Sequence, residues 1–159
     1  MKDLQEKFEI IFDFAKKSFE EVLLEVTEQT VEACDLFEIT DENKLTVVIG
    51  ISGETNGRIL LETSVEHGRN LAVAMNFGDE LDSEDDLYLY MGEFSNMFCG
   101  RATTYINDKF QKREVWITPP AIFSAKDLFV VTPHVTTKKA CFQCELGHFV
   151  IDAGFREDD

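Results

Sequence analysis

Glu93 and Asn96 place a carboxylate and a carboxamide three residues apart, in a stretch from 84 to 109 that contains no proline. On an α-helix this spacing puts two side chains about 60° apart around the axis and roughly one turn apart along it, so they project from one face. A carboxylate pairs with cations, and an amide both donates and accepts hydrogen bonds. Together they can hold a charged group and orient a water molecule, although the same residue types are also ordinary on a solvated helix.

The same helical face also carries Gly100, Thr104 and Asn107. A glycine inside a helix costs about 1 kcal/mol relative to alanine. Two interpretations of Gly100 remain open at this point. Either it allows close packing between helices of this chain, or it lets a partner molecule approach the helix closely.

The helix that would position these side chains has clear start and core signals. Ser83 is followed three residues later by Asp86, which fits a capping box, and acids in the first turn suit the helix dipole. We expect the helix to run to about Lys109. Its core-facing side chains, about 3.6 residues apart, are Leu87, Tyr90, Met91, Phe94, Phe98, Ala102 and Tyr105.

The remaining periodicities predict one α+β domain over residues 1–159, with a mainly antiparallel sheet packed against long helices. An amphipathic helix is expected from Leu4 to Val26, and a short one from the N-cap Ser64 through Met75, closed by Gly78. The expected strands are Val31–Thr40, Leu45–Ser52, Arg58–Thr63, Val115–Thr118, Leu128–Thr132 and Ala140–Ile151.

The charge balance excludes several partner classes. With 15 Lys and Arg against 31 Asp and Glu, the net charge is −16, which argues against nucleic acid and anionic membranes. No apolar run is long enough for membrane insertion, and the N-terminus does not resemble a secretory signal, so we expect a cytoplasmic protein. Seven acids and no Lys or Arg lie between Arg69 and Arg101. These acids are expected to rim the face of Glu93 and Asn96.

Other groups of potentially reactive or metal-binding residues do not form a recognisable site. Cys141 and Cys144 have zinc-like spacing, but strand alternation sends them to opposite faces and no second pair follows, so no metal ligands are predicted. The three histidines form no recognisable Ser–His–Asp set. The acids from Asp79 to Asp82 lack the ligand order of a calcium loop.

The segment from Gly92 to Gly100, GEFSNMFCG, resembles the G-E-x-x-N-M-x-x-G helix of the CheC/CheX/FliY chemotaxis phosphatases and is CheX-like in having one E-x-x-N. The resemblance extends in order over most of the chain. It covers Phe12–Val26, the two stretches Val48–Gly53 and Gly57–Leu61, the short helix at Leu71–Met75, and Ile117–Pro120.

This resemblance implies hydrolysis of the aspartyl phosphate on a CheY-type response regulator. Asn96 would orient the attacking water, Glu93 would pair with the regulator's lysine, and Gly92, Gly100 and Thr104 would contact the partner. No cofactor is expected on this chain, because the Mg²⁺ would belong to the regulator.

Two departures leave alternatives open. Leu89 stands where the family motif often has Asp or Ser, which favours a catalytically weak docking module for a response regulator. Residues 122–125, Ile-Phe-Ser-Ala, replace a glycine that commonly follows the prolines. Besides the phosphatase and the docking module, a third interpretation is a homodimeric scaffold formed through sheet edges.

Overall fold

The computed structural model describes residues 2–35 and 43–156 and places three helices and seven strands there. The helices are α1 (Lys2–Thr27), α2 (Val65–Met75) and α3 (Glu84–Phe110). The strands are β1 (Glu32–Cys34), β2 (Lys44–Gly53), β3 (Gly57–Ser64), β4 (Val115–Ile117), β5 (Ala121–Ala125), β6 (Val135–Cys144) and β7 (Gly147–Arg156).

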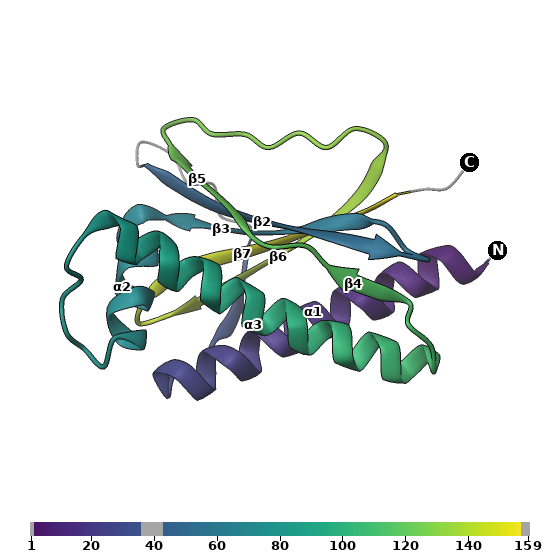
Figure 1. Cartoon of the computed structure of the whole chain (residues 1–159), viewed down its shortest axis with the longest axis horizontal. Helices are drawn as coiled ribbons and strands as arrows, with labels where there is room; N and C mark the ends of the chain where they lie inside the picture. The colour runs from purple at the N-terminus through teal and green to yellow at the C-terminus, as the bar shows by residue number, and fades with distance from the viewer. Residues whose placement is uncertain (1, 36–42, 157–159) are drawn as a thin grey trace.

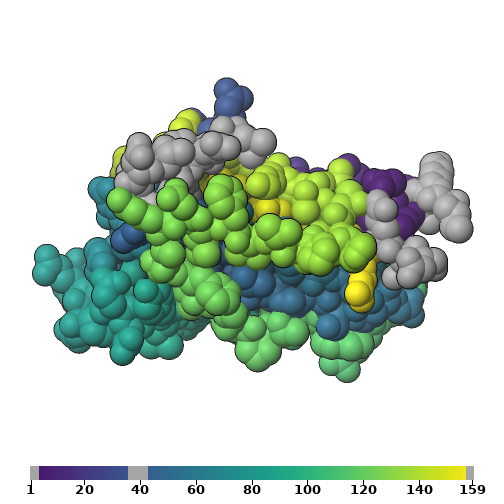
Figure 2. Space-filling model, turned by 90° about the horizontal axis from the view of Figure 1, so that it is seen from above, coloured from purple at the N-terminus to yellow at the C-terminus, as the bar shows by residue number. Residues whose placement is uncertain are grey.

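The strands form one antiparallel sheet in the order β1-β6-β7-β3-β2-β4, and β5 also pairs with β2. Helices α1 and α3 cross one face of this sheet, while the segment between β5 and β6 arches over the other (Figure 1). Seen from above, that segment runs across the sheet as a continuous ridge of residues (Figure 2). The predicted α+β architecture, a mainly antiparallel sheet against long helices, is therefore confirmed. None of the described helices is both long and apolar enough to span a bilayer.

An aromatic cluster around Phe19 holds the helices to the sheet. The Phe19 ring lies 5.7 Å from the rings of both Phe94 and Phe98 on α3, edge to face. On the sheet side, its centroid is 5.2 Å from that of Phe142 and 6.0 Å from that of Phe149. All five rings are buried. Because edge-to-face aromatic pairs add to the hydrophobic gain of burial, this cluster fixes which side of α3 faces the core.

The predicted caps are found at the starts of α2 and α3. Ser64 ends β3 and caps α2, since its hydroxyl accepts a hydrogen bond from the His67 N–H. Ser83 caps α3 in the same way, accepting from the Asp86 N–H. Gly78 takes a positive φ just beyond α2, as expected for a helix-closing glycine.

The β4–β5 edge is interrupted at Pro119 and Pro120. Between the two short strands, Thr118 pairs with β2 instead, because its N–H donates to the Gly50 carbonyl and its Oγ1 accepts from the Gly50 N–H. Proline cannot donate to a ladder, which explains why this edge divides into two strands.

Three strand predictions were wrong in detail. Residues 128–132 belong to the arched segment, and the strand in this region is β5, whose Ile122 pairs with Val47. Ala140–Ile151 is not one strand but parts of β6 and β7, joined by a turn in which Gly147 has a φ of +137°. Of Val31–Thr40 only Glu32–Cys34 forms a strand among the described residues, and residues 36–40 lie outside them.

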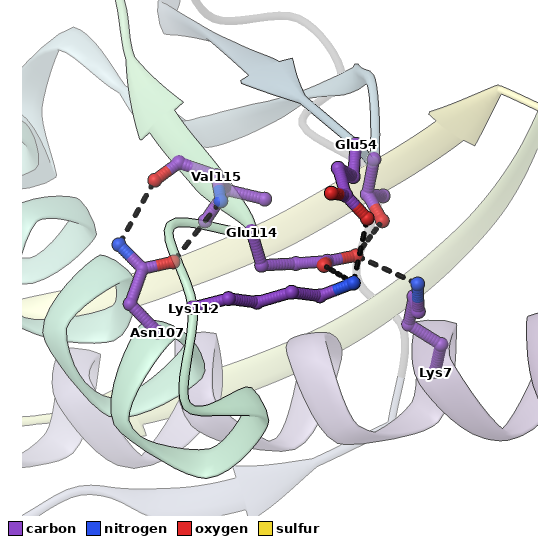
Figure 3. A network of polar contacts seen from close by, with 7 residues as sticks. Lys7, Glu54, Asn107, Lys112, Glu114 and Val115 are labelled. Carbon is purple, nitrogen blue, oxygen red and sulfur yellow. Dashed lines mark hydrogen bonds and ion pairs between the residues drawn. The ribbon is translucent and has the colours of Figure 1, made fainter.

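A buried glutamate ties the end of α3 to the rest of the domain. Glu114 is fully buried, and its carboxylate lies 2.7 Å from Lys7 Nζ and 3.2 Å from Lys112 Nζ, while Thr55 Oγ1 donates to it at 2.8 Å. Figure 3 shows Lys7 from α1, Glu54 from the β2–β3 turn and Lys112 from the segment after α3 gathered around Glu114. Burial alone raises the pKa of Glu114, but the contacts from Lys7, Thr55 and Lys112 outweigh it and hold the pKa below its ordinary value.

We predict that Glu114→Gln lowers the free energy of unfolding by about 2 kcal/mol at pH 7, because it removes a buried charge that Lys7, Thr55 and Lys112 contact. A carboxylate whose pKa is lowered by folding stabilises the native state above its unfolded pKa and loses that effect as the pH falls. The difference between wild type and variant in urea unfolding should therefore be constant above about pH 5 and shrink below it.

Glu54→Gln is the matched control, because Glu54 is an exposed partner of the same Lys112. Its loss should stay under about 1 kcal/mol. Equal losses in the two variants, or a Glu114→Gln difference that persists to about pH 3, would contradict this account of the network.

Candidate functional site

One face of α3 stays open to solvent along its middle four turns. The exposed residues there are Leu89, Glu93, Asn96, Met97 and Thr104, with Gly100 half-buried among them. The opposite face is buried and carries Leu87, Met91, Phe94, Phe98 and Ala102 as predicted. Tyr90 and Tyr105 are partly buried at its flank, where the Tyr105 hydroxyl donates to Glu21 on α1 and that of Tyr90 to Asn76.

Glu93 and Asn96 are both exposed on this face. Within residues 2–35 and 43–156, neither side chain has a hydrogen-bond or ion-pair partner, whereas most other long polar side chains flanking α3 do. A carboxylate and an amide one turn apart and unused by their own fold are available to an external group.

The two glycines of the segment have different environments. A Cβ built on Gly100 would meet nothing within 4 Å, so close packing inside this chain does not explain this glycine. A Cβ on Gly92 would lie 3.1 Å from Ile122 Cδ1 and 3.5 Å from Pro120 Cγ. Gly92 is buried beneath the start of β5, so its role is internal packing, and it does not form part of the exposed face.

Of the two remaining polar residues of the predicted face, one is exposed and the other is held by the fold. The Thr104 hydroxyl is exposed and donates to the Gly100 carbonyl one turn earlier, at 3.3 Å. Asn107 is turned toward β4, where its amide exchanges two hydrogen bonds of 3.0 Å with the backbone of Val115 (Figure 3). The exposed face of α3 therefore carries Glu93, Asn96, Gly100 and Thr104, but not Gly92 or Asn107.

Negative charge borders the site. Glu84, Asp85 and Asp86 occupy the first turn of α3, and Arg69 pairs with Glu84 there. The next cation, Arg101, donates two hydrogen bonds of 2.7 Å to the Glu25 carboxylate on α1. The hydrogen bond from Arg101 lowers the pKa of Glu25. Because both arginines are paired, neither neutralises Glu93.

No metal-binding cluster is present among the described residues: nowhere do three or more His, Cys, Asp or Glu side chains gather closely enough to hold an ion. Phe142 and Cys144 pack with the helix-side core, while Cys141 is buried outside that cluster, which agrees with the predicted alternation. Cys99, on the buried side of α3, is no candidate nucleophile, because burial raises the pKa of its thiol.

Sequence reasoning did not include Met97 in this face, although the signal was present. Met97 follows Glu93 by four residues, which places it about 40° away on a helical wheel. Its side chain is 38 % exposed, and that of Leu89, noted only as a departure from the family motif, is 65 % exposed.

Comparisons with known proteins agree with this architecture. A family model described as chemotaxis phosphatase CheX matches residues 45–145, a range that contains the whole exposed face of α3. A curated relative, the CheY-P phosphatase CheX of Thermotoga maritima, is 33 % identical over 87 residues. This alignment covers 54 % of the present chain and 55 % of the relative, about half of each.

Solved structures extend the likeness to nearly the whole fold. The chemotaxis protein CheX of Vibrio vulnificus superposes with a TM-score of 0.79 at 16 % identity, covering 92 % of this chain and 96 % of that one. The structure of a CheX–CheY–BeF3–Mg²⁺ complex from Borrelia burgdorferi superposes with a TM-score of 0.75 at 18 % identity, covering 92 % and 97 %. At these identities the structures show a shared fold.

The matched family model spans most of the chain and includes the helix, its caps and the strands that bury its other side. Sequence and fold thus agree, and this chain belongs to the chemotaxis phosphatase CheX family.

Proposed function

We propose that this chain is a phosphatase that hydrolyses the aspartyl phosphate of a CheY-type response regulator at the exposed face of α3. The observation that carries the proposal is the pair Glu93 and Asn96, which are exposed one turn apart and have no partner of their own among the described residues. In the reaction, water attacks phosphorus, the bond between phosphorus and the aspartyl oxygen breaks, and the carboxylate and inorganic phosphate are released.

Asn96 orients the attacking water. An amide does not titrate near neutral pH, so it cannot act as a general base, but its oxygen accepts and its nitrogen donates hydrogen bonds. In-line phosphoryl transfer depends chiefly on positioning and on stabilisation of charge, with little covalent work left for the protein. Holding one water in line with the phosphorus converts a random encounter into a positioned one.

Glu93 sets the register of the complex. A carboxylate pairs strongly with an ammonium group when both donor and acceptor are charged. A lysine beside the regulator's phosphoryl group would therefore place that phosphoryl group one turn along the helix, opposite Asn96. Since Arg69 and Arg101 are both paired elsewhere, they do not compete for Glu93.

Gly100 and Thr104 leave room for the partner. The open space around Gly100 admits a loop of the regulator close to the helix backbone, and the Thr104 hydroxyl lies beside it. Mg²⁺, which regulators bind through acidic oxygens, would be supplied by the partner.

The comparisons support this proposal at the level of class. The Thermotoga maritima relative is a CheY-P phosphatase, and the Borrelia burgdorferi structure is a complex of CheX with CheY, BeF3 and Mg²⁺. The location that we propose for this chain and its partner is the cytoplasm.

We predict that Asn96→Ala slows phosphate release from a phosphorylated CheY-type regulator by about 10²-fold or more, because the positioned water is lost. Glu93→Gln should slow release as well, mainly by raising the regulator concentration needed for half-maximal rate, since the amide cannot form the ion pair. The measurement is inorganic phosphate released over time at several regulator concentrations.

Glu20→Gln on α1 is the matched control, because Glu20 is an exposed helix glutamate outside this face. It should leave the rate unchanged, and circular dichroism should show all three variants folded. Wild-type rates in Asn96→Ala would refute the assigned role of Asn96. Binding of the regulator without any acceleration in the wild type would favour the docking module instead.

Gly100→Ala should separate stability from activity. The added methyl group meets nothing within 4 Å, and alanine is the better helix former, so the free energy of unfolding should rise by about 0.5–1 kcal/mol. Phosphate release should nevertheless fall, because the methyl group occupies space left for the regulator.

Gly92→Ala provides the comparison. Its methyl group would press on Ile122, so stability should not exceed that of the wild type. Denaturant unfolding of both variants measures the difference. Destabilisation by Gly100→Ala would show that Gly100 serves the fold. Full activity in that variant would show that the regulator does not need the space beside Gly100.

A further inference from the structure

The middle of the exposed face of α3 is poor in charge compared with α1 as a whole. From residues 89 to 104, only Glu93 among the five exposed side chains is charged. On α1, six of the eight exposed side chains described are charged. Those eight are Gln5, Glu6, Glu9, Asp13, Lys17, Glu20, Leu24 and Glu25. A solvated helix face normally carries charge, whereas the centres of protein interfaces are depleted of it and enriched in methionine and aromatic residues.

Leu89 and Met97 make up the apolar part of this face. They are two turns apart and project on either side of Glu93, one turn from each. Leu89 is 65 % and Met97 38 % exposed, so much of both side chains is available for contact. A lone exposed leucine needs no explanation, but here two large apolar side chains lie on either side of an unpaired Glu–Asn pair on the same face of one helix.

Acids border this part of α3 at one end, the start of the helix. Glu84 and Asp85 are exposed in the first turn of α3, and Asp82 is exposed just before it. An apolar centre with a charged rim is the usual anatomy of a protein–protein interface. Because these flanking groups are acidic, the partner that fits this face carries a cation, as does the receiver domain whose lysine is proposed to meet Glu93.

We propose that Leu89 and Met97 are apolar docking contacts for the phosphorylated receiver domain. This inference rests on the proposed function for the identity of the partner. The receiver would place an apolar side chain over Leu89 next to the lysine that pairs with Glu93. A polar residue at this position would contribute to docking affinity through a hydrogen bond. Leu89 contributes instead by burying apolar surface against the receiver.

The test measures binding separately from catalysis. The probe is a receiver domain of a CheY-type regulator from the same genome, loaded with Mg²⁺ and beryllofluoride, which mimics the phosphoryl group without being hydrolysed. Leu89→Ala should weaken binding in titration calorimetry by about tenfold, and Met97→Ala by about threefold, since its side chain is less exposed. Leu89→Met should retain wild-type affinity within about twofold, because it keeps the apolar surface and the helix propensity.

Val131→Ala is the matched control, since Val131 is 84 % exposed on the arched segment at the opposite face of the sheet. It should bind like the wild type, and denaturant unfolding should show all variants equally stable. Wild-type affinity in Leu89→Ala, an equal loss in Val131→Ala, or no binding of the loaded receiver by the wild type would each overturn the inference. Phosphate release by the wild type, measured in parallel, tests the proposed function separately. If the wild type binds the loaded receiver but does not accelerate phosphate release, the docking contacts stand and the proposed catalytic activity is wrong.

Discussion

The orientation of α3 depends on the packing of Phe19 against it. Phe94 and Phe98 lie one turn apart on α3, and both meet the Phe19 ring edge to face, while Phe142 and Phe149 hold that ring from the sheet. A helix rotated by a single residue would expose these two large rings and bury Glu93. Burial of the rings therefore decides that Glu93 and Asn96 face solvent, and the proposed chemistry is a consequence of core packing.

Polar contacts at the two ends of α3 complete this placement. Ser83 begins the helix through its cap, and Asn107 holds its last turns to the backbone of Val115. Glu114 then joins the following strand to Lys7 at the start of α1. These contacts use the polar groups at the helix ends, and the central exposed groups stay unused. The division suits a site that must be rigid and yet open to a second protein.

Much of this was predictable from the sequence, and the failures have physical reasons. The helix positions followed from local signals, because the serine caps and the 3.6-residue spacing of Phe94 and Phe98 need no knowledge of the rest of the chain. The pairing of the strands could not be predicted from such local signals. Residues 128–132 have strand-like composition, yet β5 forms earlier, where Ile122 pairs with Val47 and packs against Gly92. These contacts are tertiary, and propensity does not report them.

The site shows the same limit. The face shared by Glu93 and Asn96 was visible as a spacing, but two of its predicted members could be judged only in three dimensions. Gly92 proved to be packed beneath Ile122, whereas Gly100 has empty space above it. The sequence alone cannot distinguish a glycine that makes room for another part of the same chain from one that makes room for a second molecule.

The most direct test of the central claim is turnover. A regulator phosphorylated by a small phosphodonor, freed of that donor and held in excess, would be mixed with about one-tenth of its concentration of this chain. Its phosphate loss would then be followed in time. If the exposed face of α3 is catalytic, each molecule of the chain dephosphorylates many regulators, and the rate rises in proportion to the amount of chain added. Loss of phosphate at the regulator's own intrinsic rate, across regulators that bind the chain, would contradict the account.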